Sequence, residues 1–141
     1  MAHQKGADET LFLDTRGILT RGYASQTTAG NLFIVRHGKL VTPFTNNCLN
    51  GVTRQAMMEI AAQEGFRVAE EPLLLSDVYS TQEVFIADTA VEVVPVVTVD
   101  NLLIGKAAPG PITRHLAAAY SRYVRVHGTL IYPDQPEMLA A

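Results

Sequence analysis

The stretch NLFIVRHGKLVT, residues 31–42, carries the clearest structural signal in the chain and decides its fold class. Two apolar runs, Leu32–Val35 and Lys39–Thr42, flank the segment Arg36-His37-Gly38. Glycine readily adopts the positive φ that a tight turn between antiparallel strands requires. We therefore predict a short antiparallel hairpin here, and hence a sheet as the framework of the protein.

Apolar segments bounded by turn residues predict further strands on both sides of this hairpin. The expected strands are Thr10–Leu13, closed by a turn at Asp14–Gly17, then Phe66–Ala69, Val84–Ala87 and Val91–Val99, the last ending in an Asp100-Asn101 turn. Residues 20–30 and 43–50 are small or polar, and we expect loops there.

Apolar residues three and four positions apart predict helices. The first begins at Gly51-Val52-Thr53 and ends before Gly65, with an apolar stripe of Val52, Ala56, Met57, Ile60 and Ala61. Ser76-Asp77 is expected to cap one helical turn that ends near Ser80. The last helix follows Pro109-Gly110-Pro111 and carries Ile112, Leu116, Ala119, Tyr120 and Tyr123 on one face. The fold class expected is α+β, a mostly antiparallel sheet packed with helices.

Length and composition set limits on the function. The chain has 141 residues, 48 % hydrophobic and 18 % charged, which suits a single globular domain. Its net charge is −3 and its basic residues are scattered, so we expect neither nucleic acid nor a membrane surface as a partner. Cys48 stands alone, so no internal disulfide is expected, and no segment has the apolar length of a signal core or a membrane span. These features favour a cytoplasmic protein.

Two segments have the chemistry of an anion site. Asn50-Gly51-Val52-Thr53-Arg54 brings free backbone N–H groups and a hydroxyl to the positive end of a helix dipole, a combination that binds phosphate. The alternative is an ordinary helix start with Thr53 as the cap. Ala87-Asp88-Thr89-Ala90 interrupts two apolar strands, and its amides and the Thr89 hydroxyl are a second candidate; the alternative there is a plain turn between strands.

Other polar residues give weaker signals. His3, His37, His115 and His127 have no metal-ligand spacing, and solvated surface roles are favoured for His37 and His115. A Cys48–His pair would require the fold to bring the two together. Glu70-Glu71 is interpreted as a solvated strand end. No metal site is predicted.

Several segments together resemble the class IV aminotransferases, which are fold-type IV pyridoxal-phosphate enzymes. Ala7–Asp14 resembles an early strand of that family, and Asn31–Val35 with Gly38 and Thr42-Pro43 resembles its hairpin motif N-x-F-x-V … G … T-P. Gly51–Arg54 resembles G-I-T-R, and Val84–Ala90 with Glu92 and Pro95 resembles E-V-F-x-x-G-T-A-x-E-x-x-P-V. Gly110–Thr113 resembles G-P-V-T, which is most typical of the branched-chain aminotransferases. The motifs occur in order over residues 7–128.

The resemblance implies a fold, a cofactor and a set of site residues. Residues 1–128 would form part of the family's large, C-terminal domain, and residues 129–141 a tail. Pyridoxal 5'-phosphate is the implied cofactor, with Gln26, Gly51, Val52, Thr53 and Thr89 as its binding residues, and Thr89 and Ala90 as binding residues for the substrate. The implied partners are an amino acid and a 2-oxo acid. A homo-oligomer is also expected, because apolar surface would be exposed where the rest of the domain packs.

The sequence departs from the family at three places. The family's Schiff-base lysine lies upstream of the strand at residues 10–13, before Met1, and Lys5, Lys39 and Lys106 do not take its position. The acid that pairs with the pyridine nitrogen is replaced by Gln26, or by Arg21 if residues are counted forward from Gly17. Asp88 replaces a glycine and is expected to weaken anion binding.

These departures predict no catalytic residue in this chain and no transaminase activity from the chain alone. Two alternatives remain open. One is a non-catalytic descendant that serves as a binding or assembly module. The other is a relative of the aminodeoxychorismate lyases or D-amino-acid aminotransferases.

Overall fold

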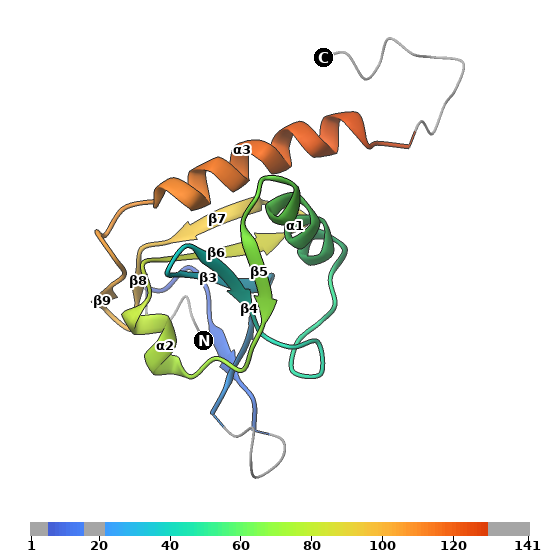
Figure 1. Ribbon diagram of the computed structural model, residues 1–141. Coiled ribbons are helices and arrows are strands. Elements are labelled where there is room, and N and C mark those ends of the chain that lie inside the picture. Colours follow the sequence, from blue (N-terminus) through green and yellow to red (C-terminus); the bar gives the residue numbers. More distant parts are fainter. Residues whose placement is uncertain (1–5, 16–21, 130–141) are drawn as a thin grey trace.

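The computed structural model describes residues 6–15 and 22–129 (Figure 1). The strands, in chain order, are β1 Leu11–Leu13, β2 Ala24–Thr27, β3 Asn31–Arg36, β4 Lys39–Thr42, β5 Arg67–Glu70, β6 Glu83–Asp88, β7 Glu92–Val96, β8 Thr98–Val99 and β9 Leu102–Leu103. The helices are α1 Val52–Gln63, α2 Leu75–Ser80 and α3 Pro111–Val126. The α+β fold class predicted from sequence is confirmed.

Strand β3 is the centre of the main sheet. It pairs antiparallel with β4 and, at Asn31, with β2 along one edge, and antiparallel with β6 along the other. Strand β1 extends the sheet beyond β2, and β7 extends it beyond β6. Only β5, which runs alongside β4, is parallel to its neighbour within this sheet. The β3–β4 hairpin has the predicted bounds to within a residue, with positive φ at His37 (52°) and Gly38 (72°).

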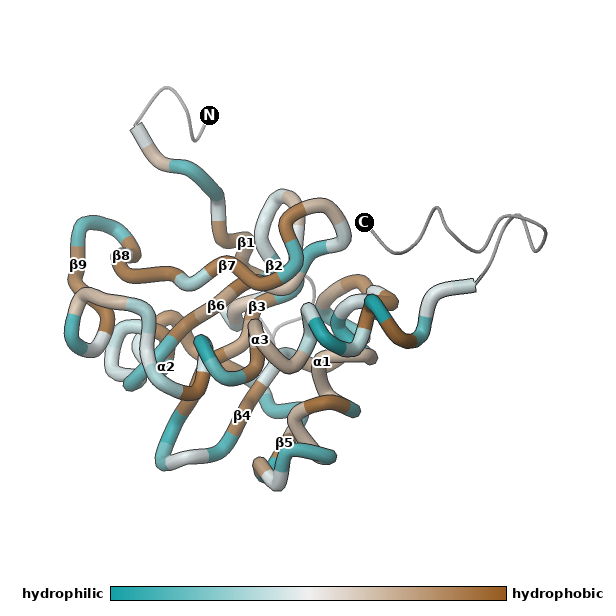
Figure 2. Tube along the Cα trace, turned by 90° about the horizontal axis from the view of Figure 1, so that it is seen from above, coloured by the Kyte–Doolittle hydropathy of each residue, from teal (hydrophilic) through white to brown (hydrophobic). Residues whose placement is uncertain are grey.

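Alternating residues of β3 and β6 bury both faces of the sheet. Phe33 and Phe85, whose rings stack 5.0 Å apart, face α1 and α3, where they meet Met57 and Leu116. The opposite face is covered by α2 and by the segment that follows β9; its core consists of Ala24, Leu32, Ile34, Val41, Leu73, Val78, Val84 and Ile104. Figure 1 shows α3 lying across β6 and β7, and Figure 2 shows hydrophobic residues along the central strands and hydrophilic residues in connecting turns.

A buried carboxylate joins the sheet to the last helix. Glu83, the first residue of β6, accepts hydrogen bonds from the Ile112 N–H (3.2 Å), the Thr113 N–H (2.7 Å) and the Thr113 hydroxyl (2.7 Å). A Cβ on Gly110, at the N-cap of α3, would lie 1.9 Å from the Glu83 carboxyl carbon, so only glycine leaves room for this contact. A negative charge at this point neutralises the positive end of the α3 dipole.

Several sequence expectations are wrong. The single strand expected at Val91–Val99 is two strands, because β7 belongs to the main sheet and β8 pairs with β9 in a separate sheet. Residues 20–30 are not wholly a loop, because Ala24–Thr27 forms β2 between β1 and β3, where tertiary hydrogen bonds compensate for small polar residues of low strand propensity. Val52 is 82 % exposed rather than part of the buried stripe, because the first turn of α1 buries Thr53 and Arg54 instead.

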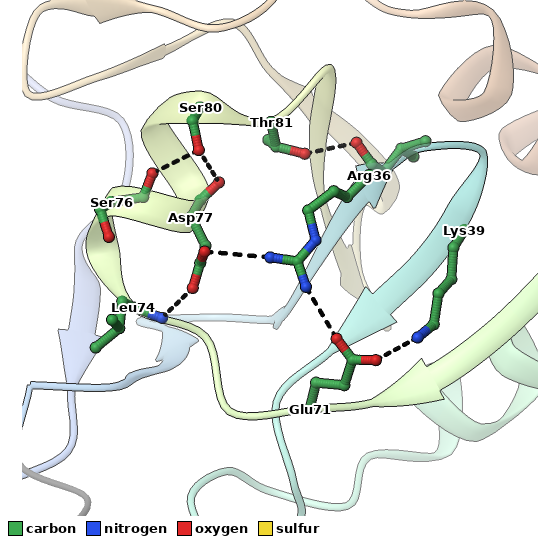
Figure 3. Close-up of polar contacts among 9 residues, drawn as sticks. Arg36, Lys39, Glu71, Leu74, Ser76, Asp77, Ser80 and Thr81 are labelled. Carbon is green, nitrogen blue, oxygen red and sulfur yellow. Dashed lines mark hydrogen bonds and ion pairs between the residues drawn. The ribbon is translucent and has the colours of Figure 1, made fainter.

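Glu70-Glu71 is the strand end that was predicted and is partly exposed, but both carboxylates are also ion-paired. Glu70 pairs with buried Arg54, and Glu71 accepts hydrogen bonds from Arg36 and Lys39. Figure 3 shows Arg36 between Glu71 and Asp77, so this ion network ties the β3–β4 hairpin to α2. Asp77 also accepts a hydrogen bond from the Leu74 N–H. Leu74 is the N-cap of α2, so Ser76 lies inside the helix and does not cap it as predicted.

No helix in the described part of the chain has the length and apolar character needed to cross a bilayer. Residues 6–15 and 22–129 also contain no group of three or more His, Cys, Asp or Glu side chains arranged to hold a metal ion.

Candidate functional site

The start of α1 has open backbone donors. Gly51 is its N-cap, with an extended backbone (φ −66°, ψ 148°), and glycine has no side chain to cap the helix. The expectation that Thr53 serves as the cap is therefore wrong, because Thr53 is the second residue inside the helix. The first turn also holds no acidic residue. The first N–H groups of a helix have no partner within it, so this end combines donors with a positive dipole.

The fold brings Thr53 and Thr89 together. Their hydroxyl oxygens lie 3.3 Å apart, although the residues are 36 positions apart in sequence. Thr53 is at the start of α1, and Thr89 is the first residue of the turn between β6 and β7. The two segments singled out from sequence as anion sites therefore meet at these two hydroxyls.

Asn31 organises the loop that enters α1. Its Nδ2 donates a hydrogen bond to the Leu49 carbonyl (2.8 Å), and a Cβ on Gly51 would lie 2.7 Å from its Oδ1. Gly51 is thus required by close packing against Asn31. From sequence, Asn31 is a motif residue with no predicted role; the available signal is a polar residue at the start of an otherwise apolar strand.

Gln26 lies on the other side of this loop. It pairs with Asn31 in the β2–β3 ladder, and its Oε1 accepts a hydrogen bond from the Leu49 N–H (2.7 Å). A pocket of about 430 Å³ opens beside it, lined by Phe12, Ser25, Gln26, Thr45, Asn46, Asn47, Cys48 and Leu49. Thr53 and Thr89 do not line this pocket. Arg21, the alternative position for this role, lies outside the described residues.

A buried cation lies beneath the start of α1. The Arg54 side chain is 2 % exposed, and its Nη2 donates hydrogen bonds to Glu70 (2.5 Å) and to the Pro43 carbonyl (2.8 Å). Its Nη1 donates to Asn50 (3.3 Å), and its buried Nε has no hydrogen-bond partner. Desolvation raises the pKa of nearby Cys48, while Arg54 opposes that shift. Cys48 is therefore held as the weakly nucleophilic thiol.

The backbone amides of the β6–β7 turn donate hydrogen bonds to Asp88, a residue of the same hairpin. Asp88 Oδ1 accepts hydrogen bonds from the Ala90 N–H (2.8 Å) and the Val91 N–H (3.3 Å). Ala90 was expected to offer its amide to a substrate, and that amide is bonded to Asp88 here. Thr89 and Ala90 are both exposed.

The remaining titratable candidates lie elsewhere. His115 Nε2 is 2.6 Å from Glu64, and His127 Nδ1 is 3.0 Å from the Tyr123 carbonyl oxygen, so both belong to the surface of α3. Lys39 is opposite Arg36, at the end of β3 remote from Asn31, roughly 16 Å away along the strand. Lys106 follows Gly105, and Gly105 packs on Gln82. The Gln82 N–H donates a hydrogen bond to the Val35 carbonyl, so Lys106 also lies near the end of β3 remote from Asn31. Lys5 and His3 lie outside the described residues.

The fold and these motifs define a class of protein, and comparison with known proteins shows the same class. Residues 1–99 match the family described as amino-transferase class IV, so the chain belongs to the class IV aminotransferase family. Pyridoxal phosphate is the cofactor of this family.

Its relatives include branched-chain aminotransferases. The chain is 37 % identical over 134 residues to a putative branched-chain-amino-acid aminotransferase of Methanocaldococcus jannaschii, covering 94 % of this chain and 45 % of that protein. It is 38 % identical over 115 residues to the branched-chain-amino-acid aminotransferase of Pseudomonas aeruginosa, covering 82 % of this chain and 36 % of that protein.

Solved structures give the same result. The branched-chain amino acid aminotransferase of Escherichia coli superposes with a TM-score of 0.79 and 36 % identity, covering 86 % of this chain and 39 % of that one. The branched-chain amino acid aminotransferase of Thermobaculum terrenum, in its PLP-form, gives a TM-score of 0.79 and 33 % identity, covering 87 % of this chain and 39 % of that one. This chain thus spans less than half the length of the relatives it matches.

Proposed function

We propose that this chain is part of a pyridoxal-phosphate-dependent aminotransferase that moves an amino group between a branched-chain or other amino acid and a 2-oxo acid. Residues 1–128 would be part of its large domain and residues 129–141 a tail. The observation that carries the proposal is the meeting of the Thr53 and Thr89 hydroxyls above the uncapped start of α1.

The residues at this point fit the phosphate end of the cofactor. The amides of Val52 and Thr53 and the two threonine hydroxyls would bind the phosphate, with Gly51 keeping the backbone close to Asn31. The buried guanidinium of Arg54 is paired with Glu70, so it fixes the loop that enters α1, through Pro43 and Asn50, without adding net charge. When bound, the cofactor supplies an electron sink for amino-group transfer.

Gln26 fits the pyridine-ring end of the cofactor less well than the residues above fit its phosphate. An amide carries no charge, so it cannot hold a pyridine nitrogen in its protonated form as a carboxylate does. We also propose that the chain alone does not catalyse transamination, since the described lysines, Lys39 and Lys106, are at the far end of β3. Non-catalytic binding and a lyase-type activity are the alternatives.

Binding of pyridoxamine 5'-phosphate, followed by ³¹P NMR, tests the phosphate site, because this compound has no aldehyde to label exposed lysines. We expect Thr53→Val and Thr89→Val each to weaken binding about tenfold, the loss of one hydrogen bond to a charged group. Thr113→Val, a buried threonine at the other helix start, is the matched control and should leave binding unchanged. Equal binding by all four proteins, or none by the wild type, would refute the site.

The inactivity of the chain is tested separately. The protein is incubated with pyridoxal phosphate, reduced with borohydride and analysed by intact mass and peptide mapping. Scattered substoichiometric labelling, or no label, is expected. One stoichiometric adduct on a single lysine would contradict this part of the proposal, and an assay of amino transfer would follow.

A further inference from the structure

The loop that enters α1 ends in the pair Asn50-Gly51, and Asn50 is the only asparagine of the sequence that is followed by glycine. In such a pair the backbone nitrogen of the glycine can attack the carbonyl carbon of the asparagine side chain, because glycine has no Cβ to obstruct the approach. Asn50 is exposed, and residues 49–51 belong to no helix or strand. Regular structure therefore does not hold the two reacting atoms apart.

The contacts of Asn50 favour this reaction. Its Oδ1 accepts a hydrogen bond from Arg54 Nη1 (3.3 Å), and this oxygen is the atom on which negative charge develops when the carbonyl carbon is attacked. The Gly51 N–H donates to no acceptor among the described residues, so no hydrogen bond has to break before the nitrogen reacts. Asn50 and Arg54 also line a pocket of about 320 Å³ that opens to solvent, so water reaches the reacting groups.

From this arrangement we propose that Asn50 is a site of spontaneous deamidation, which places a negative charge at the start of α1. The Gly51 nitrogen bonds to Cγ of Asn50 and loses its proton, and the side-chain nitrogen of Asn50 leaves with that proton as ammonia. The product is a five-membered succinimide ring. Water then adds to one of the two ring carbonyls and opens the ring, which gives aspartate or isoaspartate at this position. The sequence of steps needs no oxidant, reductant or enzyme.

The new carboxylate acts on the phosphate site at the start of α1, so this consequence rests on the proposed function. Asn50 is two positions before Val52, so their Cα atoms lie within about 7.6 Å of each other. A negative charge at this distance repels a bound phosphate. The fold itself accepts the charge, because it lies at the positive end of the α1 dipole and beside Arg54. Conversion to aspartate should therefore weaken anion binding without loss of stability.

The modification is tested first, in the absence of any ligand. The folded protein is kept for days at physiological temperature and neutral pH in ¹⁸O-labelled water, and its peptides are analysed by mass spectrometry. We expect most chains to exchange the side-chain amide of Asn50 for a labelled carboxylate. Asn50→Gln should take up no label there, and Asn101, which is exposed but followed by leucine, should stay unmodified. The urea-unfolded chain is the positive control, and labelling of Asn50 only in that chain would overturn the proposal.

Binding of pyridoxamine 5'-phosphate, followed by ³¹P NMR, tests the consequence. Asn50→Asp should bind about tenfold more weakly than Asn50→Gln, a comparison that isolates the charge because both variants lack the native side chain. The deamidated wild type, separated by anion exchange, should bind no more tightly than Asn50→Asp. Asn101→Asp is the matched control, because it adds the same charge between β8 and β9, which Figure 1 shows on the opposite side of the molecule from α1. It should change binding less than about twofold.

The outcomes separate this inference from the proposed function. If the wild type binds and Asn50→Asp binds as tightly as Asn50→Gln, the inference is overturned while the cofactor site stands. An equal loss of binding in Asn101→Asp also overturns it, since general charge would then suffice. If the wild type does not bind, the proposed function fails and the consequence drawn here fails with it, whereas the mass analysis decides the modification by itself. Urea unfolding should give Asn50→Asp at least the stability of Asn50→Gln, and a lower stability would contradict the inference, which requires the folded chain to carry the charge.

Discussion

Helices α1 and α3 begin with the same kind of N-cap, but only at α3 does a carboxylate of the described residues accept hydrogen bonds from the first amides. Each has a glycine N-cap in extended conformation, Gly51 or Gly110, with no capping hydrogen bond from that residue. At α3, the carboxylate of Glu83 reaches over from β6 and accepts from two backbone amides and a hydroxyl. At α1, the Thr53 hydroxyl contacts the Thr89 hydroxyl, and Arg54 of the first turn is paired with Glu70.

The difference separates a structural helix start from a binding one. A protein-borne anion satisfies the donors of α3 permanently, so that end contributes to stability. The donors of α1 are left for a ligand, and the positive end of the helix dipole favours an anionic one. The same contrast recurs on a smaller scale in the β6–β7 turn, where Asp88 satisfies the amides and Thr89 turns toward α1.

The largest effect is expected at the start of α3, where Glu83 accepts hydrogen bonds from the helix. Glu83→Ala should lower the free energy of unfolding by about 3 kcal/mol, because it leaves buried donors without a partner. Glu83→Gln, which keeps an acceptor of the same shape, should cost about 1 kcal/mol. Urea unfolding measures both. Glu92→Ala, on the neighbouring exposed strand end, is the control. An equal loss of unfolding free energy in that variant would mean that Glu83 has no special role at the start of α3.

A smaller effect comes from the threonine at each start. Thr113→Val should destabilise the protein by about 1.5 kcal/mol, since its hydroxyl donates to a buried carboxylate. Thr53→Val should cost less than about 0.5 kcal/mol, because its hydroxyl contacts only another hydroxyl. Thermal unfolding of the two variants side by side gives the comparison. Equal losses would mean that the α1 start is also structural.

The smallest effect concerns a partly exposed carboxylate with cationic partners. The hydrogen bond from Lys39, with the charge of Arg36, lowers the pKa of Glu71 below its ordinary value of 4.5. The stability that Glu71 supplies is therefore present above that value and is lost as the pH falls through its lowered pKa. Glu71→Gln should reduce the acid-induced fall in unfolding free energy by less than about 1 kcal/mol. Denaturant unfolding at a series of acidic pH values measures it, with Glu59→Gln on exposed α1 surface as the control.

Much of the framework could be predicted because it is local. The β3–β4 hairpin follows from two apolar runs around His37-Gly38, and α3 follows from Pro109-Gly110-Pro111 and the spacing of Leu116 and Tyr120. Strand β2 could not be found in this way, because Ala24–Thr27 has no apolar alternation and is held by pairing with β1 and β3.

For the candidate site, the sequence by itself determined the residue types: a glycine and threonine at a helix start, and a second threonine in a turn. Only the tertiary structure decided which donors stay open. The approach of Thr89 to Thr53, the cap that Glu83 provides to α3 and the pairing of Arg54 with Glu70 all join residues distant in sequence. Such contacts depend on how β6 and β5 pack against the helices, and no local pattern encodes that packing. Asp88 is the intermediate case, since its identity is visible in the sequence but its hold on the Ala90 amide is visible only in the folded turn.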